Sequence, residues 1–179
     1  MRKEIRFAGF GGQGIGLTGY ILGKAFALYD GLEAVMTQSY GPEARGGASS
    51  ASVVVSDADI AFPFVQQPDV LIAFSQEAYA RFRPDVKLDA LILVDEDLVD
   101  YQPDPWHRAV PATRIADELG RRIVANMVML GFFAAVTELV PQQAIEKAIK
   151  SSVKPTTLEL NLRAFAAGYE FAGRKEMSR

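Results

Sequence analysis

The chain of 179 residues has no cysteine and only one histidine, His107. Without cysteine it forms no disulfide, carries no thiolate nucleophile and ligates no iron–sulfur cluster through its own side chains. One histidine is too few for an ordinary zinc site, and no Ser/His/Asp arrangement stands at a meaningful spacing. The chain is therefore poor in catalytic groups. Any electron transfer in which it takes part must run through redox groups outside this chain.

Strong charge of one sign and long apolar runs are missing as well. The chain has 19 Lys and Arg against 22 Asp and Glu, for a net charge of −3, without a basic block. This balance gives no reason to expect binding to nucleic acid or to a membrane surface. No apolar stretch approaches the length that spans a bilayer, and Met1–Glu4 leads into a strand pattern without a signal region. We therefore expect a cytoplasmic protein.

What the sequence does have is a hydrophobic fraction of 49%, in which strand and helix patterns alternate without a linker. This length and composition predict one domain over residues 1–179 with a sizeable core. Continuous apolar runs at Val70–Phe74 and Leu91–Val94 are typical of strands covered on both faces, which predicts a mostly parallel sheet. Strands are expected near Ile5–Phe10, Ala34–Tyr40, Ala51–Val55, Val70–Phe74 and Leu91–Val94. The third follows the second too closely for a helical crossover, so it should run antiparallel.

Helical patterns flank this sheet and dominate the second half, so the predicted fold class is Rossmann-like α/β with a helical C-terminal half. Helices are expected over 15–29, 114–119, 123–139, 142–151 and 157–173, with a loop at Asp104–His107. Pro141 suits a first helical position, and Thr156 and Glu159 have capping-box spacing. The helix Val124–Leu139 is apolar around most of its circumference. It must therefore be covered either by this domain or by another subunit.

The densest glycine cluster, Gly9-Phe10-Gly11-Gly12-Gln13-Gly14, lies between a predicted strand and a predicted helix. Glycine permits positive φ and close approach to the backbone, while the N–H groups of the next helical turn face the ligand. Such a turn favours an anion, typically a phosphate, although a purely structural turn explains the same residues. A nicotinamide or flavin dinucleotide is disfavoured, because Glu33 precedes the second strand instead of ending it.

A second unusual segment, Thr37-Gln38-Ser39-Tyr40-Gly41-Pro42-Glu43-Ala44-Arg45-Gly46-Gly47, follows that strand. Tyr40 offers a stacking face, Arg45 a fork of donors for carboxylate or phosphate, and Gly46 a close backbone approach. A glycine–proline turn with a solvated arginine is the alternative. The candidate binding residues are Gly9, Gly11, Gly12, Gln13, Gly14, Ser39, Tyr40, Arg45 and Gly46, which we expect to form one ligand-facing edge.

Other polar groups have simpler explanations. We expect His107 to have a surface or packing role rather than to act as a base. The acidic run Asp95–Asp97 suits a solvated turn better than a cation site. Asn126 is expected to bond a neighbouring carbonyl rather than a ligand, and Ser75 to cap a helix.

The strings GFGGQG and TQSYGPEARGG resemble the gamma subunit of the 2-oxoacid:ferredoxin oxidoreductases. The resemblance is closest to the free-standing gamma subunits of 2-oxoglutarate and 2-oxoisovalerate enzymes, and it continues through Gln67–Ala73, Ser75–Tyr79 and Asn126–Gly131. It covers the chain up to about Gly131, and the second string is the more specific one.

The resemblance implies a subunit of a complex that decarboxylates a 2-oxo acid, 2-oxoglutarate in the first instance, on thiamine diphosphate. The acyl group passes to coenzyme A and the electrons pass through iron–sulfur clusters to ferredoxin. In this family the thiamine diphosphate, its Mg ion and the clusters belong to alpha, beta and, where present, delta subunits. The resemblance thus implies a chain that is inactive alone, binds no metal and contributes structure and part of the coenzyme A site. The residues by themselves also allow a stand-alone nucleotide-binding protein or a pure assembly scaffold.

Overall fold

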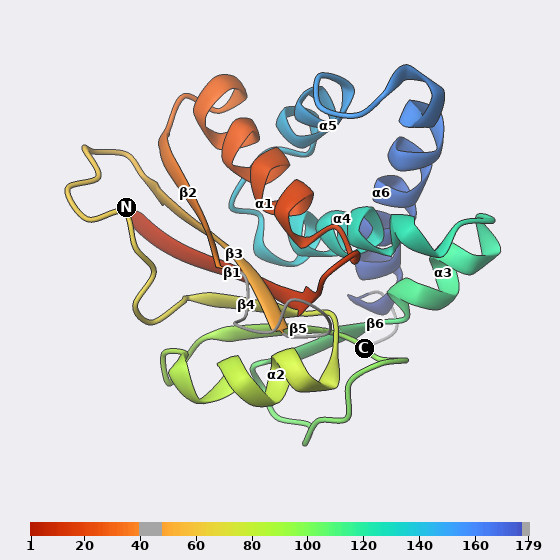
Figure 1. Cartoon of the computed structure of the whole chain (residues 1–179), viewed down its shortest axis with the longest axis horizontal. Coiled ribbons are helices and arrows are strands. Elements are labelled where there is room, and N and C mark those ends of the chain that lie inside the picture. The colour runs from red at the N-terminus through yellow and green to blue at the C-terminus, as the bar shows by residue number, and fades with distance from the viewer. Residues whose placement is uncertain (40–47, 177–179) are drawn as a thin grey trace.

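The computed structural model describes residues 1–39 and 48–176. Within them, six strands form one mixed sheet in the order β2-β3-β1-β4-β5-β6 (Figure 1). The strands are β1 (Arg2–Phe10), β2 (Glu33–Ser39), β3 (Ala48–Ser56), β4 (Val70–Ala73), β5 (Leu91–Asp95) and β6 (His107–Val110).

The sheet is parallel from β1 through β4 and β5 to β6, and β3 runs antiparallel to both of its neighbours, β1 and β2. The predicted mostly parallel sheet and the antiparallel third strand are therefore confirmed. The expected loop at Asp104–His107 is wrong at its end, because His107 begins β6. This strand has four residues and follows a proline-rich turn, so it is too short to give a readable alternation.

The five predicted helices are present with shifted ends, and the structure adds a helix after the expected cap Ser75 and a short helical turn behind it. They are α1 (Ile15–Lys24) with its π-helical continuation η1 (Ala25–Tyr29), α2 (Gln76–Phe82), η2 (Arg83–Asp85), α3 (Ala112–Glu118), η3 (Arg122–Val124), α4 (Ala125–Thr137), α5 (Gln142–Lys150) and α6 (Pro155–Glu176). Ser75 caps α2, since its hydroxyl accepts from the Ala78 N–H at 3.2 Å. The capping box is wrong, because α6 begins at Pro155 and Thr156 lies inside its first turn. Pro141 precedes α5 by one residue instead of opening it.

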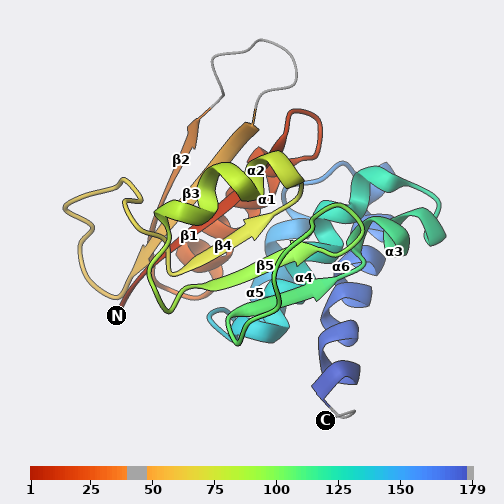
Figure 2. The ribbon, with the colours of Figure 1, turned by 90° about the horizontal axis from the view of Figure 1, so that it is seen from below.

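The helices divide unequally between the two faces of the sheet. Helices α1 and α4 lie on one face, with α5 and α6 packed outside them, while α2 lies on the other face and stands in front of the sheet in Figure 2. Alternate strand residues follow this division, because Phe7 and Ile72 belong to the larger core and Ala8 and Ala73 to the smaller one beneath α2. The parallel strands are buried on both faces, as their continuous apolar runs predict.

Helix α4 is the centre of the larger core. Every residue from Ala125 to Ala134 is buried, and α1, α3, α5 and α6 all contact this helix. The domain itself therefore covers the helix, which confirms the first of the two interpretations. Two glycines allow α4 and α6 to approach closely. A Cβ at Gly168 of α6 would lie 2.7 Å from the carbonyl carbon of Val128, and a Cβ at Gly131 of α4 would lie 2.9 Å from the carbonyl carbon of Phe165.

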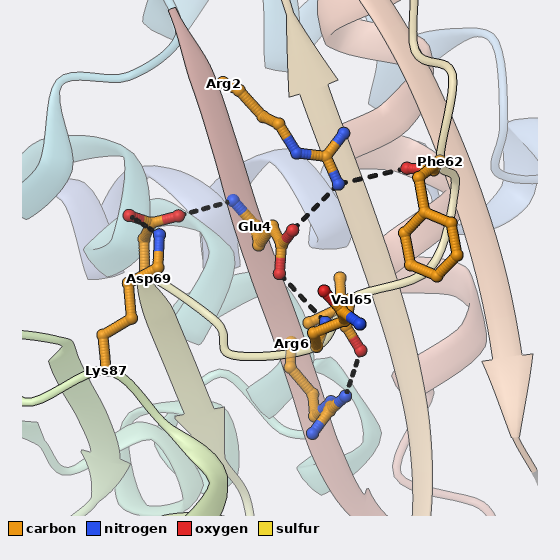
Figure 3. A network of polar contacts seen from close by, with 8 residues as sticks. Arg2, Glu4, Arg6, Phe62, Val65, Asp69 and Lys87 are labelled. Carbon is orange, nitrogen blue, oxygen red and sulfur yellow. Dashed lines mark hydrogen bonds and ion pairs between the residues drawn. The ribbon is translucent and has the colours of Figure 1, made fainter.

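The connection between β3 and β4 is held by charged side chains of β1 (Figure 3). Arg2 donates to the carbonyl oxygen of Phe62 at 3.1 Å, and Arg6 donates to that of Val65 at 3.2 Å. Between them, Glu4 accepts from Arg2 at 2.8 Å and from the backbone N–H of residue 66 at 3.0 Å. Three alternate residues of one strand thus fix a segment that has no helix or strand of its own.

Candidate functional site: the crevice at the carboxyl ends of the parallel strands

The site lies where two neighbouring parallel strands send their helices to opposite faces of the sheet. Helix α1 follows β1 on one face, and α2 follows β4 on the other (Figure 1). Ligands of open α/β sheets bind at such a switch point, beyond the carboxyl ends of the strands. A cavity of about 890 Å³ lies there. Its walls come from the glycine turn, the start of α2, the end of β5, and the segments around Thr113 and Ile123.

The glycine turn has the backbone that its sequence predicts. Gly12 has φ 90° and Gly14 has φ 75°, both in the left-handed region that favours glycine. Gly14 is the N-cap of α1, and no side chain of the described residues caps this helix. Its first N–H groups thus keep their capacity to bind an anion. Asn126 fixes the turn from below, since its amide donates to the Gly14 carbonyl oxygen at 3.5 Å and accepts from the Met127 N–H at 2.8 Å. The expected structural role of Asn126 is confirmed.

Gln13 joins the two strands that border the crevice. Its side-chain oxygen accepts from the Phe10 N–H at 2.6 Å, and its amide nitrogen donates to the Phe74 carbonyl oxygen at 2.9 Å. Gly9 makes room for this bridge, because a Cβ there would crowd the Gln13 amide and lie 2.9 Å from Ile15. Gln13 lines the cavity, but its polar atoms already hold the turn following β1 to the end of β4. It thereby sets the width of the crevice at this point.

The described part of the second predicted segment lies at the same edge of the sheet. Ser39 ends β2 opposite Ser50 of β3. At the same edge of the sheet, Phe10 ends β1 opposite Ala48 of β3. A Cβ at Gly16, in the first turn of α1, would meet the amide of Gln38. The end of β2 is thus beside the helix that follows the glycine turn. Tyr40, Arg45 and Gly46 lie outside the described residues, so their part in a ligand-facing edge stays a prediction.

Asp95, at the end of β5, is a member of the cavity wall that sequence reasoning missed. The residue is 1% exposed, and its carboxylate accepts from the Thr113 N–H at 2.9 Å and from the Thr113 hydroxyl at 2.6 Å. Burial raises the pKa of Asp95, and the bonds from Thr113 oppose that shift. The expected solvated turn is therefore wrong for Asp95, although its neighbours Glu96 and Asp97 do lie toward solvent and pair with Arg114. An acid that directly ends a buried strand is the signal that could have identified it.

The rest of the lining combines apolar and polar side chains. Phe10, Phe74, Leu98, Ile123 and Ala125 provide the apolar part. The polar part comes from Ser75, Gln76, Glu77, Asp95, Thr113 and Arg122.

The lining pairs one hydroxyl with a carboxylate, because Thr113 donates to Asp95 at 2.6 Å. Within residues 1–39 and 48–176, no group of three His, Asp or Glu side chains is placed to hold a metal ion. His107 lies outside the cavity and is buried, so its packing role is confirmed. Open α/β proteins commonly bind ligands in crevices of this kind, which are largely apolar with a few polar groups and lie at a switch point.

Comparisons with known proteins identify the family to which this chain belongs. The family model for pyruvate ferredoxin/flavodoxin oxidoreductase matches residues 4–171. The chain is 55% identical over 177 residues to the 2-oxoglutarate synthase subunit KorC of Methanocaldococcus jannaschii, covering 96% of this chain and 95% of the relative. It therefore belongs to the pyruvate ferredoxin/flavodoxin oxidoreductase family, as a gamma subunit of the 2-oxoacid:ferredoxin enzymes.

Two solved structures share the whole fold. The gamma subunit of a keto/oxoacid ferredoxin oxidoreductase from Geobacter sulfurreducens PCA superposes with a TM-score of 0.87 at 44% identity, over 96% of this chain and 97% of that one. The 2-oxoglutarate:ferredoxin oxidoreductase from Magnetococcus marinus, solved with 2-oxoglutarate, coenzyme A and succinyl-CoA, gives a TM-score of 0.86 at 25% identity. That match covers 97% of this chain but 31% of the longer chain. The described helices include none with the length and apolarity to cross a membrane.

Proposed function

We propose that this chain is the gamma subunit of a 2-oxoglutarate:ferredoxin oxidoreductase and that its crevice seats part of coenzyme A. The whole chain, residues 1–179, acts in this proposal as one domain of a cytoplasmic complex. Alpha and beta subunits, with a delta subunit where one exists, supply the thiamine diphosphate, its Mg ion and the iron–sulfur clusters. The proposal draws its substrate from the 55% identical relative, which is a 2-oxoglutarate synthase subunit.

The observation that carries the coenzyme A role is the cavity at the switch point, entered beside the glycine turn. Its volume of about 890 Å³ is in the range of sites for small molecules and cofactors. Coenzyme A has phosphates, which suit the uncapped N-terminus of α1, and a long, weakly polar arm, which suits the apolar part of the lining formed by Phe10, Phe74 and Ile123. The lining offers polar groups for binding, among them Ser75, Gln76 and Arg122, which suits a subunit that holds an acyl acceptor for chemistry on another chain.

Arg45 is the principal charge of the proposed phosphate site, and its removal tests the proposal. Arg45→Ala in the assembled complex should raise the KM for coenzyme A by roughly 10- to 150-fold, which corresponds to a charge-assisted hydrogen bond of about 1.5–3 kcal/mol. Decarboxylation with an artificial acceptor that bypasses coenzyme A should change much less. Arg163→Ala is the matched control, because it removes the same charge from an exposed position of α6. Equal losses in both activities, or no loss in either, would make Arg45 an interface or solvated residue.

The division of labour between subunits has its own test. The purified chain, supplied with 2-oxoglutarate, thiamine diphosphate, Mg, coenzyme A and ferredoxin, should show no turnover. Addition of the alpha and beta subunits should restore it. Turnover by the isolated chain would refute the subunit assignment, and a nucleotide that co-purifies with it would favour the stand-alone binding protein.

A further inference from the structure

His107 is the buried centre of a polar cluster on the α2 side of the sheet. Its side chain is 2% exposed. The ring nitrogen Nδ1 lies 2.7 Å from Oδ1 of Asp104, and Nε2 lies 3.0 Å from the hydroxyl of Tyr79. The ring of Tyr101 stacks on the imidazole, with centroids 5.1 Å apart and planes inclined by 15°. Both ring nitrogens and one ring face of the only histidine are thus occupied.

The cluster defines one arrangement of protons. The Asp104 carboxylate also accepts the backbone N–H groups of Trp106 at 2.8 Å and His107 at 3.0 Å, and the hydrogen bond from the imidazole lowers its pKa. A carboxylate only accepts, so Nδ1 carries a proton and donates to Asp104. In the imidazole with its single proton on Nδ1, Nε2 accepts from the Tyr79 hydroxyl. The imidazole therefore links an anchored loop to a helix through two directional bonds.

That helix is α2, which forms one wall of the crevice. Gln76, Glu77 and Ala80 all line the cavity, and Tyr79 lies between them in sequence. Among the described residues α2 is the only α-helix on its face of the sheet, so no neighbouring helix holds it in place. A second bond to the same connection, from the Asp100 N–H to the Gln76 side-chain oxygen at 2.7 Å, lies at the start of α2. The β5–β6 connection and the first residue of β6 thus hold α2 at two points one turn apart.

We propose that His107, oriented by Asp104, is a positioning residue that acts through Tyr79 to hold α2 in place as one wall of the crevice. The width of the crevice between α2 and the glycine turn then depends on a histidine that touches no ligand. The effect on coenzyme A rests on the function proposed above, whereas the effect on α2 does not.

The first test measures α2 directly, in the purified full chain. Tyr79→Phe removes one hydroxyl from the cluster, and Tyr101→Phe is the matched control, because the Tyr101 hydroxyl makes no hydrogen bond to the described residues. Amide hydrogen exchange of residues 79–82 should accelerate about fivefold in the first variant, the factor for a hydrogen bond worth about 1 kcal/mol, and stay unchanged in the control. Equal exchange in both variants would overturn the proposal.

Two substitutions of His107 separate its hydrogen bond to Tyr79 from its contribution to packing. In His107→Gln, the side-chain amide reaches the former place of Nε2 and still accepts from Tyr79. In His107→Asn, the shorter amide reaches only the place of Nδ1 and leaves Tyr79 without its acceptor. The glutamine variant should keep most of the protection of residues 79–82, and the asparagine variant should lose it. If both variants lose it to the same extent, His107 has a packing role only.

The second test uses the assembled enzyme. Tyr79→Phe should raise the KM for coenzyme A by about two- to tenfold, with kcat nearly unchanged, because the cavity wall moves while the reacting groups on other chains do not. Faster exchange in α2 with an unchanged KM would support the proposal that His107 positions α2, and would refute the proposal that coenzyme A binds in this crevice. Unchanged exchange would refute the positioning role whatever the KM.

Discussion

The close backbone contact between α4 and α6 predicts that a single added methyl group destabilises the protein. Substitution Gly168→Ala places a Cβ against the Val128 carbonyl oxygen, 2.7 Å from the carbonyl carbon of that residue and 3.0 Å from the Phe132 nitrogen. All three neighbours are backbone atoms, so no rotamer change relieves the overlap. Non-bonded carbon atoms prefer about 3.5–4.0 Å, and the two helices must therefore separate locally by roughly 1 Å.

The free energy of unfolding should fall by about 2 kcal/mol or more. Overpacking of a well-packed core costs about 1–3 kcal/mol, with rigid contacts at the upper end or above it. Replacing glycine by alanine inside a helix returns about 1 kcal/mol. Urea denaturation followed by circular dichroism measures the difference. Gly173→Ala is the matched control on the same helix, because nothing lies within 4 Å of its added Cβ, and it should be neutral or stabilising by up to about 1 kcal/mol.

A double substitution tests the mechanism itself. Gly131→Ala inserts a methyl group at the same helix contact from the other side, with its Cβ 2.9 Å from both the Phe165 carbonyl carbon and the Tyr169 nitrogen. Once one methyl group has separated the helices, the second should cost less, so the two losses should sum to more than the loss in the double variant. Equal stability of Gly168→Ala and Gly173→Ala, or strict additivity in the double variant, would refute the argument from close backbone packing.

Three further predictions concern polar contacts. The pKa of Asp69 is lowered, since burial raises it but bonds from Lys87 and from the Glu4 N–H outweigh that effect. It therefore stabilises the fold above its unfolded pKa of about 3.9, and this contribution is lost as the pH falls through the folded pKa; acid titration of Asp69→Asn should show a flatter decline. Thr113→Val removes the hydroxyl that bonds Asp95 and should cost about 1–3 kcal/mol in thermal unfolding. Ser75→Ala should cost about 1 kcal/mol through loss of the α2 cap, while Ser75→Asp should retain most of the stability.

The sequence predicts well wherever one local pattern decides the structure. Apolar runs such as Leu91–Val94 could only be covered strands, and the glycine spacing from Gly9 to Gly14 required a strand-to-helix turn with positive φ. The antiparallel β3 followed from the length of the connection alone. The family resemblance also needed no structure, because GFGGQG and TQSYGPEARGG are both continuous in sequence.

What the sequence did not predict depends on contacts between distant segments. Asp95 looked like part of an acidic turn, and only the approach of Thr113, 18 residues further on, makes it a buried member of the cavity wall. His107 looked like a loop residue, because β6 is defined by pairing with β5 rather than by its own pattern. Gln13 was expected to contact a ligand, and its bond to Phe74 could not be known before β1 and β4 were placed side by side.

The covering of α4 has a consequence for how the protein is made. Its last covering helix, α6, ends at residue 176, which is 39 residues after the end of α4 at Thr137. At about 5–20 residues per second, a ribosome adds those residues in roughly 2–8 s. Throughout that time α4, which is apolar around most of its circumference, is without α6, the helix whose backbone touches its own. During this interval the growing chain carries an apolar helix whose cover is incomplete, which favours aggregation and binding by chaperones.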